Sequence, residues 1–210
     1  MTTPDFDADF RARLLDLFIW RRDVRRFRSD PLPAGMLETL IGMADLSPSV
    51  GLSQPWRYVS VDDPGRRAAV CESFERANAD ALADYSGDRA SLYARLKLAG
   101  LRECPAHLAV FCDESTLKGE GLGRKTMPEM LHYSVVAAIS TFWLAARAHG
   151  IGVGWVSILE PDVVTDVLDV PPEWRLIGYL CAGYPLEESD KPALETAGWE
   201  TRDPQPIVQR

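Results

Sequence analysis

Apolar residues recur at helical spacing in three parts of the chain, and each part predicts a helix. The first amphipathic helix is expected over residues 7–20. The second begins at Pro33, because proline is favoured in the first turn of a helix, and ends before Ser47. The third covers residues 128–149, where apolar side chains occupy most of the circumference, which predicts a buried central helix. Shorter apolar runs predict strands at 57–61, 107–112, 150–159 and 174–184, and a short helix at 161–168.

Polar and charged stretches separate these elements. Residues 66–85 and 89–101 are rich in alanine and charge, which predicts a helical hairpin that covers the core. Residues 47–56 contain two prolines, a glycine and three serines, so they are expected to form a loop, and loops of this kind often carry function. The polar tail from about residue 186 is expected to wrap a surface or a partner subunit. Because there is no repeat or low-complexity linker, residues 1–210 are expected to form one domain.

The bulk composition is that of a globular protein, with 46% hydrophobic and 26% charged residues. A formal net charge of -8 argues against nucleic acid as a partner, because counterion release requires a broad basic surface. The acidic start does not resemble a signal peptide, and no apolar run approaches the roughly 18 residues of a membrane span. The four cysteines form no CxxC pair. We therefore expect a cytoplasmic protein with free thiols.

Five of the eight residues from Arg21 to Arg28 are arginine, although the protein as a whole is acidic. A guanidinium presents a planar fork of donors that matches two phosphate oxygens. This concentration of arginines predicts a site for a small phosphorylated ligand. Asp23 lies among them and either pairs with the arginines or faces the ligand as an acceptor. The alternative is a solvated basic patch at the end of a helix, stabilised by the helix dipole.

Motifs for other chemistries do not fit. The G-x-G-x-G at residues 150–154 precedes a strand, whereas the dinucleotide fingerprint follows one. The glycine-rich stretch 121–126 lacks the G-K-[ST] order of a phosphate loop. The three histidines form no HExxH and no other metal-ligand spacing, so no metal is expected. Ser157 lacks the flanking glycines of a hydrolase nucleophile.

Several segments together resemble the nitroreductase-like FMN enzymes, and within them the BluB branch, the 5,6-dimethylbenzimidazole synthases. Residues 21–25 read R-R-D-V-R, as in this branch, where other flavin reductases of the fold usually have serine in place of the aspartate. The loop S-P-S-V-G-L-S-Q-P-W at 47–56 and the strand G-I-G-V-G-W-V-S at 150–157 follow in the family's order and spacing. Residues 76–100 are similar to the lid of the branch. The likeness extends from about residue 20 to residue 202.

The resemblance implies an α+β fold, in which a mixed, largely antiparallel sheet is flanked by helices. It implies an intertwined homodimer with the flavin between the subunits. A helical lid at about residues 66–101 would cover the flavin, and the tail from about residue 186 would wrap the partner. The implied reaction converts reduced FMN and O2 to erythrose 4-phosphate and 5,6-dimethylbenzimidazole, the lower ligand of vitamin B12. A separate flavin reductase would supply the electrons.

The same resemblance implies roles for individual residues. Asp23 would be a general base or an orienting group near the ribityl carbon that is lost, and the surrounding arginines favour its ionised form. Ser157 would orient the flavin. Arg21, Arg22 and Arg25 would hold the phosphate and the ribityl chain. The full set of expected flavin contacts is Arg21, Arg22, Asp23, Val24, Arg25, Pro48, Ser49, Gln54, Arg89, Leu98, Trp155, Val156 and Ser157.

Two positions depart from the branch, and two other functions stay open. The branch often has an acid where Leu131 stands, and a Gln-Asn-like pair where Ser140 and Thr141 stand. An NAD(P)H-dependent nitro- or quinone reductase with permanently bound FMN predicts an open flavin face. A non-catalytic flavin-binding protein predicts tight binding without product. Asp23 and Ser157 occur together with a lid, which favours the synthase.

Overall fold

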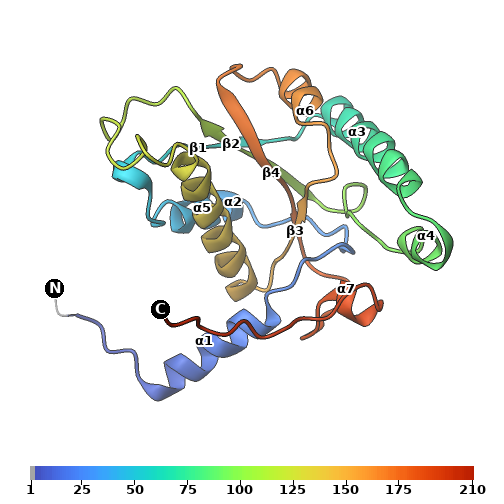
Figure 1. Ribbon diagram of the computed structural model, residues 1–210, viewed down its shortest axis with the longest axis horizontal. Helices are drawn as coiled ribbons and strands as arrows, with labels where there is room; N and C mark the ends of the chain where they lie inside the picture. Colours follow the sequence, from blue (N-terminus) through green and yellow to red (C-terminus); the bar gives the residue numbers. More distant parts are fainter. Residues whose placement is uncertain (1–2) are drawn as a thin grey trace.

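The protein is built on one four-stranded antiparallel sheet with helices on both faces, as described by a computed structural model for residues 3–210 (Figure 1). The strand order is β1-β2-β4-β3. The strands are β1 (Trp56–Ser60), β2 (Ala106–Asp113), β3 (Gly152–Val156) and β4 (Trp174–Gly183). The helices are α1 (Ala8–Trp20), α2 (Met36–Ala44), α3 (Pro64–Ala83), α4 (Gly87–Tyr93), α5 (Met130–Ala148), α6 (Pro161–Leu168) and α7 (Ala193–Thr196), with a 3-10 turn, η1 (Val50–Leu52). The predicted α+β class is confirmed. Among the described residues, parallel pairing is limited to one isolated bridge between Asp23 and Val153.

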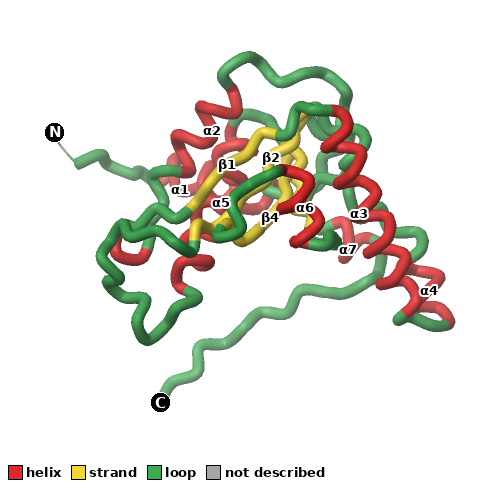
Figure 2. The backbone as a smooth tube through the Cα atoms, turned by 90° about the horizontal axis from the view of Figure 1, so that it is seen from above, coloured by secondary structure: helices red, strands yellow, loops and turns green. Residues whose placement is uncertain are grey.

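β2 is buried along its whole length, and its side chains alternate between two cores on opposite faces of the sheet. Val110 and Cys112 pack in the core that includes α5 and α2. Ala109 and Phe111 pack in the core that includes α3 and α6. This alternation follows from the period of two residues in a strand. Figure 2 shows α2 on one side of the strands and α3 and α6 on the other.

α5 is the central helix that its apolar circumference predicts. Seven of its residues are buried, and it packs against α2 and against all four strands. It begins at Met130, two residues after the predicted start. Within residues 3–210, no helix is long and apolar enough to cross a membrane.

The second helix begins later than its proline predicts. α2 starts at Met36 rather than at Pro33, because Gly35 precedes it in the left-handed conformation, with φ of 78°. The strand predicted over residues 150–159 is shorter, since β3 covers only Gly152–Val156.

The prediction of a second hairpin helix over residues 89–101 is wrong beyond Tyr93, where α4 ends. Residues 99–101 enter the core instead of continuing the helix. A Cβ atom on Gly100 would lie 2.4 Å from the Phe27 ring, so this backbone packs directly on that ring. Burial against Phe27 outweighs the helical preference of the local sequence. The hairpin is also part of the core, because Val70 and Cys71 of α3 are buried in it.

Candidate functional site

The arginine-rich segment, residues 21–28, leaves the end of α1 and runs along the sheet edge that β3 forms. Val24 N donates a hydrogen bond to Val153 O at 3.0 Å, and Arg28 N donates one to Tyr184 O at 2.9 Å. The bond from Val24 covers part of the free edge of β3, which is one of the two edge strands, and the bond from Arg28 lies just beyond the end of β4. The segment is therefore fixed to the sheet by its own backbone.

Two glycines of β3 allow this close approach. A Cβ atom on Gly154 would lie 2.2 Å from the carbonyl oxygen of Val24, and one on Gly152 would lie 2.7 Å from the Val24 side chain. Glycine in a strand often marks such an approach. The glycine-led strand therefore accommodates the backbone that carries Asp23 and the arginines.

Asp23 connects the arginine-rich segment to β3. Its Oδ1 accepts a hydrogen bond from Trp155 N at 3.0 Å, and its Oδ2 accepts one from Arg25 Nε at 2.8 Å. The side chain remains 31% exposed. Because each carboxylate oxygen has a second lone pair, Asp23 is oriented and can still accept a further hydrogen bond or a proton.

The three predicted phosphate-binding arginines have different surroundings. Arg25 Nη1 donates to Lys97 O at 3.2 Å. The Arg21 guanidinium lies over the Trp143 ring, 4.8 Å from its centre. Arg22 Nε is buried and has no hydrogen-bond partner among the described residues. Burial and the charge of Arg21 lower the pKa of the Arg22 guanidinium. A bound anion would supply the missing partner and offset this cost.

A cavity of about 450 Å³ lies beside the arginine-rich segment, and we call it the basic cavity. Its wall combines this segment with residues 95–97 and with the tail from residue 187 to residue 197. Six cationic side chains line it, against the two acids Asp23 and Glu187. The cationic residues are Arg22, Arg25, Arg26, Arg95, Lys97 and Lys191. The cavity therefore has the volume of a small-molecule site and the charge of an anion site.

Arg95, Lys97 and Lys191 were missed as site residues from the sequence. Arg95 and Lys97 lie in the segment predicted to be helical, and Lys191 lies in the polar tail. Neither segment carries a phosphate-binding motif, so only the fold shows that these three side chains line the same cavity as the arginines.

The predicted loop residues Pro48, Ser49 and Gln54 lie elsewhere. Ser49 Oγ accepts a hydrogen bond from Gln54 N at 3.0 Å, which closes the loop on itself. The loop is attached to α5, since Val50 N donates to Ser134 Oγ at 3.0 Å. Pro48, Ser49 and Gln54 do not line the basic cavity within the described part of the chain. Within one chain, these loop residues therefore lie apart from the arginine-rich segment, although the resemblance assigns both groups to one flavin site.

The remaining predicted contacts do not line the basic cavity within residues 3–210. Trp155 is half-buried and Val156 is buried at the end of β3, and Ser157 follows as an exposed residue. Arg89 of α4 donates to Trp199 O at 2.9 Å and lies 3.7 Å from the centre of its ring. Leu98 lines a second cavity of about 170 Å³ next to α3.

Leu131 and Thr141, which stand at positions where this chain departs from the branch, have structural roles. Leu131 is buried in the core around α5, where an acid would lack solvent. Thr141 holds the loop at residues 47–56, because Ser47 Oγ donates to its Oγ1 at 2.6 Å. Ser140 is exposed.

Comparison with known proteins places this arrangement in a family. The sequence profile described as "Nitroreductase family" matches residues 19–184, which is most of the chain. The chain belongs to the nitroreductase family. The predicted family is therefore confirmed, and the arginine-rich segment, β3 and the central helix α5 all fall within the matched region.

Full-length relatives narrow the comparison within the nitroreductase family. The chain is 57% identical over 209 residues to 5,6-dimethylbenzimidazole synthase of Rhodospirillum rubrum, which covers 100% of this chain and 99% of the relative. It is 43% identical over 200 residues to 5,6-dimethylbenzimidazole synthase of Rhodobacter capsulatus, covering 95% and 97%. Oxidised iodotyrosine deiodinase bound to FMN and 3-iodo-L-tyrosine has a similar fold, with a TM-score of 0.72, 23% identity and coverage of 94% and 97%.

Proposed function

We propose that this nitroreductase-family protein is a 5,6-dimethylbenzimidazole synthase that converts reduced FMN and O2 to 5,6-dimethylbenzimidazole and erythrose 4-phosphate. The observation that carries the proposal is the placement of Asp23. Its carboxylate is oriented by Arg25 and by Trp155 N at the wall of the basic cavity. The full-length identity of 57% to the Rhodospirillum rubrum synthase supports the same activity.

The residues of the basic cavity fit a phosphorylated flavin. The wall carries an excess of cationic side chains, and Arg22 Nε has no hydrogen-bond partner among residues 3–210. Arg22 and Arg25 would hold the phosphate and the ribityl chain, with Arg21 behind them on Trp143. Lys97 and Lys191 add charge from the lid and the tail. An orphaned buried donor next to a cavity is the feature that a bound anion would satisfy.

Reduced FMN, when bound, supplies the dimethyl-substituted ring and the electrons that O2 accepts. The protein residues position it and move a proton. Asp23 would accept a proton from the ribityl carbon that stays in the benzimidazole, because erythrose 4-phosphate takes only the other four ribityl carbons. The contacts of Asp23 with Arg25 and Trp155 N keep it oriented. The Ser157 hydroxyl orients the flavin ring. The lid, residues 66–101, and the tail exclude water and nicotinamide from the ring.

The reaction also needs partners. Because reduced FMN is consumed, a separate flavin reductase would supply it, and the protein would work in the cytoplasm. A homodimer would bring the loop residues Pro48, Ser49 and Gln54 of one subunit to the flavin of the other.

Substitution of Asp23 by asparagine tests the proposal, because it keeps the shape of the side chain and removes its charge. The measurement is the yield of 5,6-dimethylbenzimidazole in a single turnover, with saturating reduced FMN and then air. We expect Asp23→Asn to lower the rate by about 10²–10⁴-fold, the usual range for a lost general base. Binding of reduced FMN should stay similar or tighten, since a negative charge near the phosphate is removed.

Asp30→Asn is the matched control. Asp30 lies just after the arginine-rich segment and pairs with Arg28 on the surface, so its loss should leave turnover unchanged. Product formation by Asp23→Asn at the unmutated rate would contradict the catalytic role of Asp23. Rapid oxidation of NADPH by the bound flavin, with no benzimidazole formed, would instead identify an NAD(P)H-dependent reductase. Tight flavin binding without either reaction would identify a binding protein.

A further inference from the structure

Three buried side chains converge beneath the loop that leads into β2, and we call them the thiol–imidazole cluster. They are Cys104 in the loop, His107 in β2 and Cys181 in β4. Their ligand atoms all lie within 4.8 Å of one another. The side chains are 4%, 1% and 0% exposed. In the sheet, His107 stands directly opposite Cys181, which places two of the three on adjacent strands.

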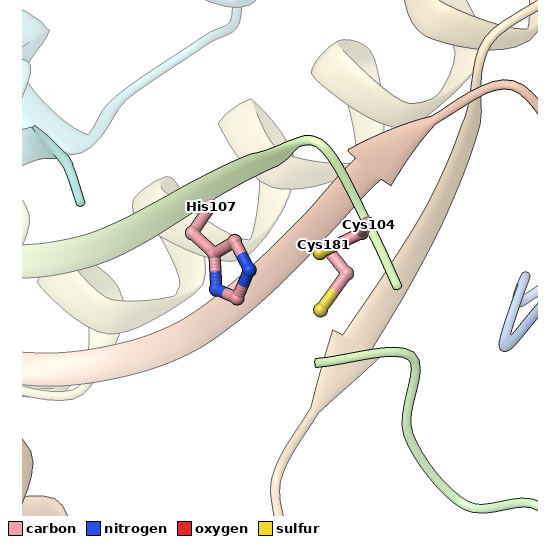
Figure 3. A group of neighbouring side chains, drawn as sticks. All are labelled: Cys104, His107 and Cys181. Atoms are coloured by element: carbon pink, nitrogen blue, oxygen red, sulfur yellow. The ribbon is translucent and has the colours of Figure 1, made fainter. Parts of the chain in front are cut away.

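The orientation of His107 suits a ligand. Its Nδ1 is engaged with Tyr179 Oη at 2.9 Å, and Tyr179 is itself fully buried. Figure 3 shows the other ring nitrogen directed toward the two cysteines. A metal-bound histidine usually has its second nitrogen held by such an outer partner, which fixes the ring orientation.

The two thiols are also unequal. A hydrogen bond from Cys181 and the nearby His107 lower the pKa of the Cys104 thiol to about 6, against the effect of burial. The same contact, together with burial, raises the pKa of Cys181. Both pKa changes have one geometric cause, the direct contact between the two sulfurs.

We propose that Cys104, His107 and Cys181 form a binding site for one thiophilic divalent cation, Zn²⁺. Two sulfurs and one imidazole are a ligand set that zinc prefers. Two thiolates balance the charge of Zn²⁺, so no net charge is left in the buried site, whereas Cu⁺ would leave one negative charge. Tetrahedral zinc with ordinary bond lengths places its ligands about 3.5–3.8 Å apart. The cluster therefore needs to contract by about 1 Å, which side-chain rotation can supply.

The position of the site indicates its role. Cys104 N donates to Gly100 O at 3.0 Å, so Cys104 ends the segment that packs on Phe27. A cation held by Cys104, His107 and Cys181 would tie this segment to both central strands of the sheet. The same segment carries Lys97 to the basic cavity. The inference does not rest on the proposed function, because it concerns the attachment of this segment and not the chemistry in the cavity.

Metal binding by the reduced, chelator-treated protein tests the proposal. We expect one Zn²⁺ per chain in competition with a chromophoric chelator, and a higher midpoint of thermal unfolding with Zn²⁺ than without. Co²⁺ as a probe should give a thiolate-to-cobalt charge-transfer band with the intensity of two sulfur ligands. Cys104→Ala and Cys181→Ala should each weaken Zn²⁺ binding by more than about 100-fold, since even outer partners of a metal ligand are worth about 10–100-fold.

Cys112→Ala is the matched control, because Cys112 is also fully buried in β2 but packs on the other face of the sheet. It should bind Zn²⁺ as the unmutated protein does. The proposal would be overturned if the unmutated protein bound no stoichiometric zinc or bound only Cu⁺ tightly. It would also be overturned if Cys112→Ala lost as much Zn²⁺ affinity as Cys104→Ala and Cys181→Ala. A Cys104–Cys181 disulfide in protein purified without reductant, together with no metal uptake after reduction, would also overturn it. If the alanine variants do not fold, the cobalt spectrum of the unmutated protein still counts its sulfur ligands.

Discussion

Arg22 differs from its neighbours because its buried Nε has no hydrogen-bond partner in the described part of the chain, whereas its Nη2 donates to Ile19 O. Arg25 is already engaged with Asp23 and Lys97, and Arg28 pairs with Asp30 on the surface. An unsatisfied buried donor costs free energy unless a ligand pairs with it. Among the five arginines of the segment, Arg22 is therefore the one we expect to depend most on a bound phosphate.

Replacement of Arg22 tests this expectation. Arg22→Ala should weaken the binding of FMN by about 10- to 100-fold, because a charge-assisted hydrogen bond contributes about 1.5–3 kcal/mol. Binding of riboflavin, which lacks the phosphate, should hardly change. The measurement is a fluorescence titration with each flavin. Arg28→Ala is the control and should bind both flavins like the unmutated protein. Equal losses for FMN and riboflavin in Arg22→Ala would show that Arg22 does not contact the phosphate.

Individual site residues can be predicted from the sequence only where their type contrasts with the composition of the rest of the chain. Five arginines in an acidic chain are such a contrast, and three of them, Arg22, Arg25 and Arg26, line the basic cavity. Lys97 lies between two leucines in a segment predicted to be helical, and Lys191 lies in the polar tail, so a single lysine at either position does not indicate a binding site. His107 and Cys181 are 74 positions apart and become neighbours only through the pairing of β2 with β4. No spacing rule for metal ligands could have joined them.

β3 and the arginine-rich segment act as one unit, because the glycines of the strand leave room for Val24. A side chain at position 154 would collide with the carbonyl oxygen of Val24, which belongs to the backbone and cannot rotate away. The backbone of the segment would have to move, and with it the hydrogen bond from Trp155 N to Asp23.

Gly154→Ala should therefore destabilise the protein by about 1–3 kcal/mol, the usual cost of overpacking, and should also weaken FMN binding. Urea unfolding and the flavin titration measure the two effects. Gly42→Ala in α2 is the control. A Cβ atom there meets nothing within 4 Å, so alanine should be neutral or stabilise the helix by about 0.5–1 kcal/mol. A Gly154→Ala protein with unchanged stability would show that the segment does not need this close contact.

At the element scale, periodicity predicts the elements that bury one face against the sheet. α5, α6 and the four strands lie close to their expected positions, since burial imposes their apolar spacing. α1 also lies where its apolar spacing predicts, although none of its residues is buried within one chain. The prediction fails at residues 94–101, where alanine and charge are typical of a helix but the backbone packs on Phe27. That contact spans about 70 positions of the chain, and local pattern cannot show it.

A single chain leaves an apolar surface exposed and keeps the predicted flavin contacts apart. α1 has no buried residue, and it exposes the large apolar side chains Phe10, Leu15, Phe18 and Ile19. The predicted flavin contacts in the loop at residues 47–56 lie away from the basic cavity. A second copy would cover the apolar face of α1 and could bring its own loop to the cavity, so one assembly would account for both features.

Disruption of this face separates a shared site from a site within one chain. Phe18→Glu places a charge among the exposed apolar residues of α1. Light scattering should show a dimer for the unmutated protein and a monomer for Phe18→Glu. FMN binding should then fall at least about tenfold, because the variant would lose the loop contacts that the proposed dimer draws from the partner. Asp16→Lys is the matched control. It also changes a charge on α1, but it lies two residues, or about 200°, around the helix from Phe18, so it should stay dimeric. A monomeric Phe18→Glu protein that binds FMN with unchanged affinity would place the complete flavin site within one chain, and Pro48, Ser49 and Gln54 would then have no part in it.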